Sequence, residues 1–310
     1  MSSTGDKPAA IRLWPSAMAT TRLDLLDPAE VARLGGIEIV AQGVVEGFLA
    51  GLHRSPFRGF SVEFTEHRAY QPGDEPRYLD WKILARSDRL FVKQFEEETN
   101  LRAMILVDSS RSMAWRGAED RLTKRAYADR LAAALALILL RQRDATGLVT
   151  FDAAVRQVVP ARVKAGQWTR LVRGLLETPD GGGTAAEGAL RHVTSLLARR
   201  GLVVLISDLL FDRDLALTAL RYLRHRGHQV IVFHVMDRAE MELTGPPEVR
   251  FRDPESTASV VVRPRELARA YAVTVQREIA AWRSACRRHG VMYHHVQTDM
   301  PFGLALRLLA

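Results

Sequence analysis

The pattern of apolar and polar positions along the 310 residues predicts an α/β protein with a doubly wound, mostly parallel sheet. Three nearly unbroken apolar runs end near residues 107, 206 and 235, and such runs are typical of strands covered on both faces. Segments with a broad apolar face lie between and after them and predict helices, at about 127–142, 167–177, 185–199 and 214–226. Alternation of strand and helix at this spacing is typical of a doubly wound sheet.

Further elements are expected on either side of this pattern. Two strands at 147–151 and 156–160 are joined by a tight turn, and an inserted hairpin is expected at 248–253 and 259–262. A long helix over 265–289, a strand over 291–296 and a short helix from Pro301 close the chain. Upstream, we expect short helices from Asp27 and over 39–51, and strands at 60–64 and 90–95.

The expected domain organisation has four parts. Residues 1–22 are rich in small and polar residues without a period, which is typical of a disordered tail. The other three parts are an N-terminal helical segment with a loop and strand region, the α/β domain and a C-terminal helix, at 23–100, 101–300 and 301–310.

The composition indicates which kinds of partner the protein binds and in which cellular compartment it works. The net charge is +8, but acidic residues are interspersed with the five lysines and 39 arginines, which favours a solvated basic surface over nucleic-acid binding. The single cysteine, Cys286, excludes an internal disulfide and fits a reducing compartment, where we expect it to be a small packed residue. The longest apolar run, 131–140, is too short to span a bilayer, so we expect a soluble cytoplasmic protein.

Oxygen-bearing side chains follow two of the predicted core strands. Asp108 ends the first strand and is followed by Ser110 and Ser112, while Asp208 ends the second. Thr184 follows three glycines in a loop, 76 residues after Asp108 and 24 before Asp208. Because strands of this kind gather ligands at their carboxyl ends, we expect the five side chains to converge. Hydroxyl and carboxylate oxygens suit Mg²⁺ or Mn²⁺, and five donors leave one octahedral position open.

Two other interpretations of these residues stay open. In the first, Asp108 and the serines simply form a turn with side-chain caps. In the second, the chain resembles haloacid-dehalogenase-type phosphohydrolases, which use Mg²⁺ and an aspartyl nucleophile, here Asp108. Such enzymes need a carboxylate two residues after the nucleophile, where this chain has Ser110, and no phosphate-binding lysine is obvious. We therefore favour a metal site in a protein that is not an enzyme.

The order Asp-x-Ser-x-Ser, then Thr, then Asp resembles the metal-ion-dependent adhesion site of von Willebrand factor type A domains. The resemblance covers roughly residues 100–300. It implies that Ser110 and Ser112 bind the ion directly, while Thr184, Asp108 and Asp208 bind it directly or through water. It also implies that a carboxylate from a partner protein takes the open position.

The segment before the first core strand carries a second resemblance, to the domain of unknown function 58 family, over about 59–300. It rests on Ala85-Arg86 and the upstream motif Glu66-His67-Arg68-x-Tyr70-x-x-Gly73-Asp74-x-x-Arg77-x-x-Asp80-Trp81. It implies a type A-like, Rossmann-like fold, co-occurrence with MoxR-type AAA+ ATPases and an adaptor or co-chaperone role. Many members carry transmembrane helices, from which this chain departs. We expect the charged residues of the segment to hold it on the sheet or to contact a partner.

Overall fold

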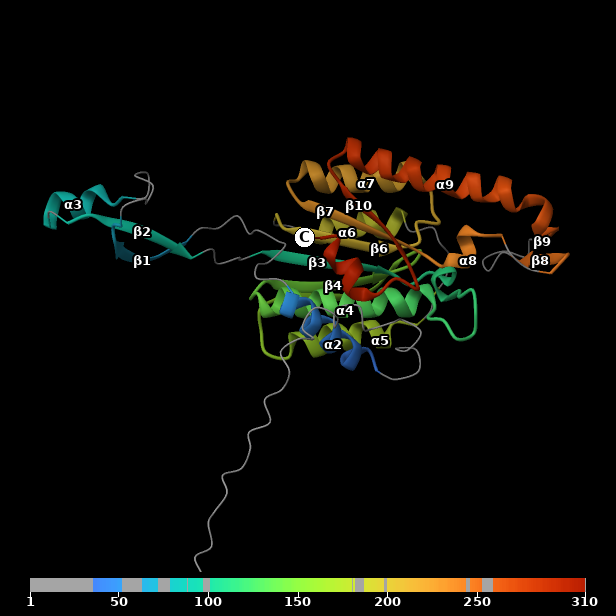
Figure 1. The fold of residues 1–310 in the computed structure, drawn as a ribbon, viewed down its shortest axis with the longest axis horizontal. Coiled ribbons are helices and arrows are strands. Elements are labelled where there is room, and N and C mark those ends of the chain that lie inside the picture. The colour runs from blue at the N-terminus through green and yellow to red at the C-terminus, as the bar shows by residue number, and fades with distance from the viewer. Residues whose placement is uncertain are drawn as a thin grey trace, which may run out of the picture.

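The structure is a computed structural model whose centre is a six-stranded sheet flanked by helices (Figure 1). It describes residues 36–51, 63–71, 79–87, 89–96, 101–179, 181, 187–197, 200–243, 246–252 and 259–309. The expected tail, the expected helix from Asp27 and the glycine-rich loop with Thr184 lie outside these ranges.

The central sheet has the strand order β10-β7-β6-β3-β4-β5. Its strands are β3 Arg102–Asp108, β4 Ala145–Phe151, β5 Val155–Arg162, β6 Leu202–Ser207, β7 Gln229–Met236 and β10 Met292–Gln297. All neighbours are parallel except the antiparallel pair of β4 and β5. The predicted α/β class with a mostly parallel sheet is therefore confirmed. From β3 the chain first adds β4 and β5 on one side and then returns to add β6, β7 and β10 on the other, so the topological switch point lies between β3 and β6.

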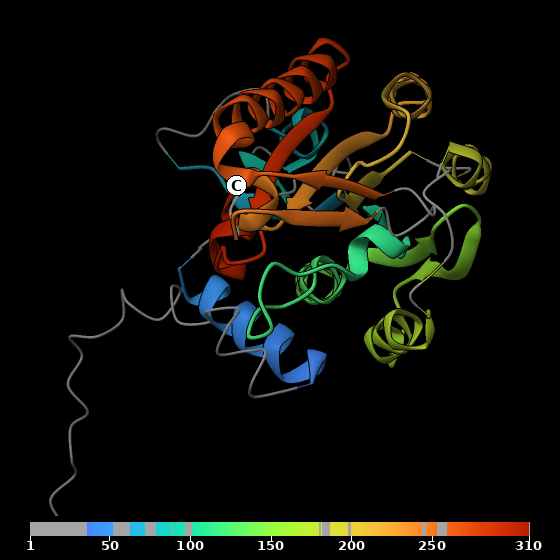
Figure 2. The same cartoon turned by 90° about the vertical axis from the view of Figure 1, so that its right-hand side faces the viewer.

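Helices cover both faces of the sheet, as Figure 2 shows from the side of the carboxyl edge. One face carries α2 Ile37–Gly51, α4 Lys124–Arg141, α5 Gln167–Glu177 and α10 Phe302–Arg307. The other carries α6 Glu187–Leu196, α7 Arg213–His225 and α9 Pro264–Arg288. Alternate residues of β3 enter the two cores, Ile105 and Val107 on one side and Met104 and Leu106 on the other. This two-sided burial explains why the strand is apolar at successive positions.

The predicted elements of the central α/β domain occur close to their expected bounds. Helix α4 begins three residues before the predicted start of 127, because the side chain of Thr123 caps it by accepting the Ala126 N–H at 3.0 Å. The expected hairpin is present as the antiparallel pair β8 Val249–Arg252 and β9 Ser259–Val262, after the short helix α8 Arg238–Met241. None of the helices in the described ranges is long and apolar enough to cross a bilayer.

The described part of the signature segment forms its own small unit. Strand β1 Glu63–Ala69 pairs antiparallel with β2 Phe91–Glu96, and α3 Trp81–Ser87 lies between them in the chain. Figure 1 shows this unit projecting away from the central sheet. Most of the charged loop that was expected to hold the segment on the sheet, residues 72–78, lies outside the described ranges, so that expectation stays a prediction. Each strand pairs with the other along one edge, and this two-stranded sheet is separate from the central one.

Candidate metal centre

The two predicted aspartates lie at the carboxyl edge of the sheet, on either side of the point where the strand order reverses. Asp108 ends β3 and Asp208 directly follows β6, and the parallel register places Val107 beside Ile206. In doubly wound sheets this crevice is where ligands bind. The two residues are 1% and 2% exposed, so both carboxylates are withdrawn from bulk water.

Hydrogen bonds join Asp108 to the predicted Ser110 and to Ser207, and the predicted Ser112 is linked through Ser110. Its Oδ1 accepts the backbone N–H of Ser110 at 2.8 Å, and its Oδ2 accepts the hydroxyl of Ser207 at 2.6 Å. The hydroxyls of Ser110 and Ser112 lie 3.1 Å apart. A short turn of 3-10 helix, η3 Arg111–Ala114, carries Ser112 back toward the strand end. One carboxylate and two hydroxyls are therefore brought together.

The electrostatics of the cluster favour a cation. Burial, and then the nearby charge of Asp208, raise the pKa of Asp108 to about 6, although the hydrogen bonds from Ser207 and Ser110 oppose the shift. Two carboxylates that repel each other in a low dielectric gain most from a positive charge placed between them.

Thr184 lies outside the described residues, but the loop that carries it begins beside the cluster. The N–H of Gly181 donates to the carbonyl of Ser109 at 2.8 Å. A Cβ at Gly181 would clash with the carboxylate of Asp152 and crowd the Ser109 carbonyl, so this close approach requires glycine. The start of the loop is thus fixed next to the end of β3, and the role of Thr184 stays a prediction.

Lys124 is a residue of the site that sequence reasoning missed. Its ammonium is buried and donates to Asp208 Oδ2 at 2.8 Å and to Glu240 Oε1 at 2.5 Å. Burial opposes its charge, but the two carboxylates outweigh burial and raise the pKa of Lys124. A signal was available, because Lys124 is the first residue of α4, where the helix dipole disfavours a cation. A cation there calls for a carboxylate from elsewhere.

Glu240 was also missed, and its position is set by helix capping. Its Oε2 accepts the backbone N–H of Asp237 at 2.8 Å, while the Asp237 side chain caps the start of α8. The spacing Asp237-x-x-Glu240 after an apolar strand is the sequence pattern of such a capping box. Oε2 is engaged by the backbone, and Oε1 is therefore directed to Lys124.

The donor chemistry of the cluster fits a hard divalent cation. The described candidates provide two carboxylates and two hydroxyls, all oxygen ligands of the kind Mg²⁺ and Mn²⁺ prefer. In the described ranges, no group of three or more His, Cys, Asp or Glu side chains is arranged to hold a metal. The serine hydroxyls and Thr184 would therefore have to contribute to the ligand set.

Two large apolar side chains are exposed beside the cluster. Trp115 follows η3, is 41% exposed and has its ring centroid 6.0 Å from Lys124 Nζ. Leu210 is 55% exposed, and its backbone N–H donates to Asp208 Oδ1 at 3.3 Å. The edge of the cluster therefore carries apolar as well as polar surface.

A protein-family model described as "Protein of unknown function DUF58" matches residues 66–281. The chain belongs to the DUF58 family. Uncharacterized proteins of Mycobacterium bovis and Mycobacterium tuberculosis are 30% identical to this DUF58 chain over 263 residues, which is 82% of it and 78% of each relative. The family predicted from the signature motif is therefore confirmed.

Two solved structures are similar to the DUF58 chain at low identity. The hypothetical protein BatB of Bacteroides thetaiotaomicron is 16% identical with a TM-score of 0.45. An aerotolerance-related membrane protein of Bacteroides fragilis is 18% identical with a TM-score of 0.46. Each match covers 67% of this chain and 96% of the solved chain.

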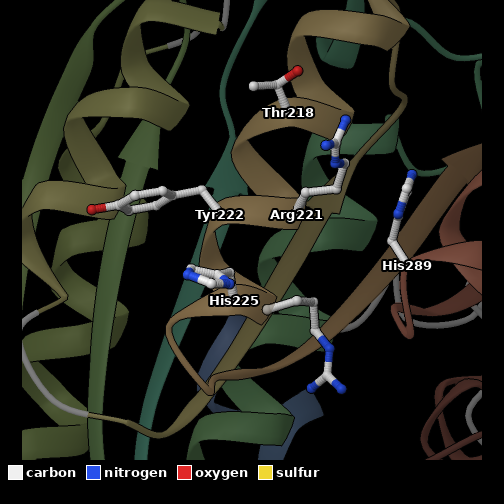
Figure 3. Close-up of a pocket in the computed structure, with 6 residues that line it drawn as sticks. Thr218, Arg221, Tyr222, His225 and His289 are labelled. Carbon is white, nitrogen blue, oxygen red and sulfur yellow. The ribbon is translucent and has the colours of Figure 1, made fainter.

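A cationic hollow of this DUF58 chain lies at the opposite edge of the sheet. Residues of α7, among them Arg221 and His225, line it together with His289 at the end of α9 (Figure 3). These residues precede the amino ends of β7 and β10. The hollow is therefore separate from the acidic cluster at the carboxyl edge.

Proposed function

We propose that this DUF58 chain is a metal-dependent protein-binding module with a von Willebrand factor type A-like fold. Asp108, Ser110, Ser112 and Asp208, with Thr184 from the adjoining loop, would hold Mg²⁺ or Mn²⁺. The bound ion would supply a positive charge that accepts a carboxylate oxygen from a partner protein.

One observation carries this proposal: the buried cluster of carboxylates and hydroxyls at the switch point of the sheet. Its hydrogen bonds hold Asp108 and the two hydroxyls together before any ligand arrives. Such preorganisation lowers the ordering cost of binding an ion. The rim supports docking of a protein, because Trp115 and Leu210 would lose exposed apolar surface when a partner covers the cluster.

The partner is proposed from the family resemblance. We propose a MoxR-type AAA+ ATPase, with this chain as its adaptor or co-chaperone and the ATPase supplying the chemical work. We also propose a cytoplasmic location, which the use of a single cysteine in 310 residues supports.

The metal step is tested by calorimetric titration of Mg²⁺ and Mn²⁺ into three purified chains. These are the wild type, Asp108→Ala and the control Asp214→Ala, which removes an exposed carboxylate on α7. We expect saturable binding in the wild type and the control, and at least a hundredfold loss in Asp108→Ala. Circular dichroism checks that each variant is folded. A folded Asp108→Ala chain that binds the ion as the wild type does would refute the ligand set.

The docking step is tested by co-purification with a MoxR-type ATPase of the same organism, with Mg²⁺ or with chelator. We expect recovery of the ATPase with Mg²⁺, and its loss with chelator or with Asp108→Ala. Equal recovery in chelator would show that docking does not use the ion.

A Mg²⁺-dependent phosphohydrolase is the second candidate, and Lys124 favours it. The absence of an obvious phosphate-binding lysine was one objection to this reading, and the structure places a buried lysine against Asp208. The other objection holds, since Ser110 stands where the acid/base carboxylate is needed. Hydrolysis of para-nitrophenyl phosphate that needs Mg²⁺ and is lost in Asp108→Asn would establish this function instead.

A further inference from the structure

The ammonium of Lys124 occupies the place of a counter-ion in the acidic cluster. It is 1% exposed and bonded to two carboxylates, those of Asp208 and Glu240. No acidic residue lies in the first turn of α4, so its own helix offers it no partner there. Its positive charge therefore depends on the carboxyl edge of the sheet.

The two carboxylates that share the ammonium differ in their relation to the candidate metal site. Asp208 follows β6 and is a candidate ligand of the ion, whereas Glu240 comes from α8. Glu240 is held in place without Lys124, because its Oε2 accepts the Asp237 N–H and its carbonyl accepts the hydroxyl of Tyr271 at 2.8 Å. Glu240 is therefore a fixed partner for the ammonium of Lys124 and is not itself a candidate metal ligand.

We infer that Lys124 is a tethered cation that competes with the divalent ion for Asp208, and that Glu240 keeps its ammonium when the ion binds. This inference rests on the proposed metal-binding function. A divalent ion bound to Asp208 and an ammonium 2.8 Å from the same carboxylate would repel each other in this buried cluster. The flexible four-carbon stem lets the ammonium release Asp208 while it keeps its bond to Glu240. Ion binding is thus an exchange of one cation for another.

Because of this exchange, the negative charge of Asp208 is balanced by Lys124 when no metal is bound. Removing one partner of a buried ion pair leaves an uncompensated charge, which is strongly destabilising. With Lys124 present, Asp208 has a counter-charge whether or not the ion is bound. The ion must displace that charge, and its affinity is lower than the two carboxylates alone would provide.

The test is the calorimetric titration of Mg²⁺ into Lys124→Met, Glu240→Gln and the control Lys164→Met, which changes an exposed lysine. We expect Lys124→Met to bind Mg²⁺ at least tenfold more tightly than the wild type, because the competitor is gone. We expect Glu240→Gln to bind it at least threefold more weakly, because the ammonium then has Asp208 as its charged partner. Lys164→Met should bind as the wild type does.

A merely structural role of Lys124 would not raise the Mg²⁺ affinity of Lys124→Met while lowering that of Glu240→Gln. Weaker or unchanged binding by a folded Lys124→Met chain overturns the inference. If that variant does not fold in chelator or in Mg²⁺, Glu240→Gln decides, and unchanged binding there overturns it.

The failure of the inference and that of the proposed function are distinguishable. The metal function itself is refuted if Mg²⁺ binds neither to the wild type, alone or with its partner, nor to Lys124→Met. Binding by the wild type that Lys124→Met does not strengthen refutes only the competition. Melting curves add a second reading, since folded Lys124→Met should melt lower than the wild type in chelator and gain more from Mg²⁺.

Discussion

At the scale of single residues, the protonation state of Asp108 would decide when the cluster could hold the proposed ion. A carboxyl group binds Mg²⁺ only after it has lost its proton, so metal binding and protonation compete. In this chain burial and the neighbouring Asp208 raise the pKa of Asp108 to about 6. The competition therefore falls only a little below neutral pH, well above the range of an exposed aspartate.

We predict that Mg²⁺ affinity falls as the pH is lowered through about 6, the raised pKa of Asp108. Above that pH the group is ionised and the affinity is level, while below it each ion displaces one proton. The loss should approach about tenfold per pH unit. Calorimetry between pH 5 and 8 measures it, with circular dichroism to check folding at each pH. An affinity that stays constant down to pH 5 would contradict the raised pKa.

Sequence reasoning predicted the candidate residues that end strands and missed the residues of helices that contact the cluster. Asp108 and Asp208 were predictable because a buried strand and the side chain after it are adjacent in the chain. Lys124 contacts Asp208 across 84 positions and Glu240 across 116. Nothing local records such partners, apart from the unfavourable place of Lys124 in the helix dipole.

At the scale of elements, the start of α4 positions Lys124. Thr123 caps the helix by accepting the Ala126 N–H at 3.0 Å, and the backbone N–H of Lys124 donates to the carbonyl of Trp115 at 3.1 Å. The first turn is thus fixed on both sides of the lysine. The cap serves the site as well as the helix.

We predict that Thr123→Ala destabilises the protein by about 1 kcal/mol, because the N-terminal N–H groups of α4 lose their side-chain acceptor. Thr123→Ser, which keeps the hydroxyl, should stay within about 0.5 kcal/mol of the wild type. Urea denaturation followed by circular dichroism gives both values. Equal stability of the alanine and serine variants would show that the cap contributes little.

Element bounds were most predictable where apolar period and turn chemistry agree. Helix α5 has the predicted bounds, Gln167–Glu177, because its apolar face starts and stops sharply. Strand β1 runs to Ala69, beyond the predicted stretch of 60–64, of which 60–62 lie outside the described residues. Its extent is set by pairing with β2, a partner distant in sequence. Pairing of this kind overrides local patterns.

At the scale of the whole molecule, the core reaches into the N-terminal segment. Helix α2 contributes Val40, Val44 and Val45 to the same apolar cluster as Leu131 and Leu135 of α4. The two helices pack against each other on one face of the sheet, and α10 lies beside α2. The predicted boundary between 100 and 101 stays a prediction, but α2 is part of what buries α4.

We predict that Val45→Asp destabilises the whole domain by about 4 kcal/mol, since a charge would enter an apolar core without a partner. Glu46→Gln, one residue further on and exposed, should change stability by less than about 0.5 kcal/mol. Thermal and urea unfolding of both variants measures the difference. If α2 were only an appendage, Val45→Asp would melt like the wild type. If α2 belongs to the domain, the unfolding of α4 and the loss of Mg²⁺ binding should follow the same shifted transition, because α4 packs on β3, the strand that ends in Asp108.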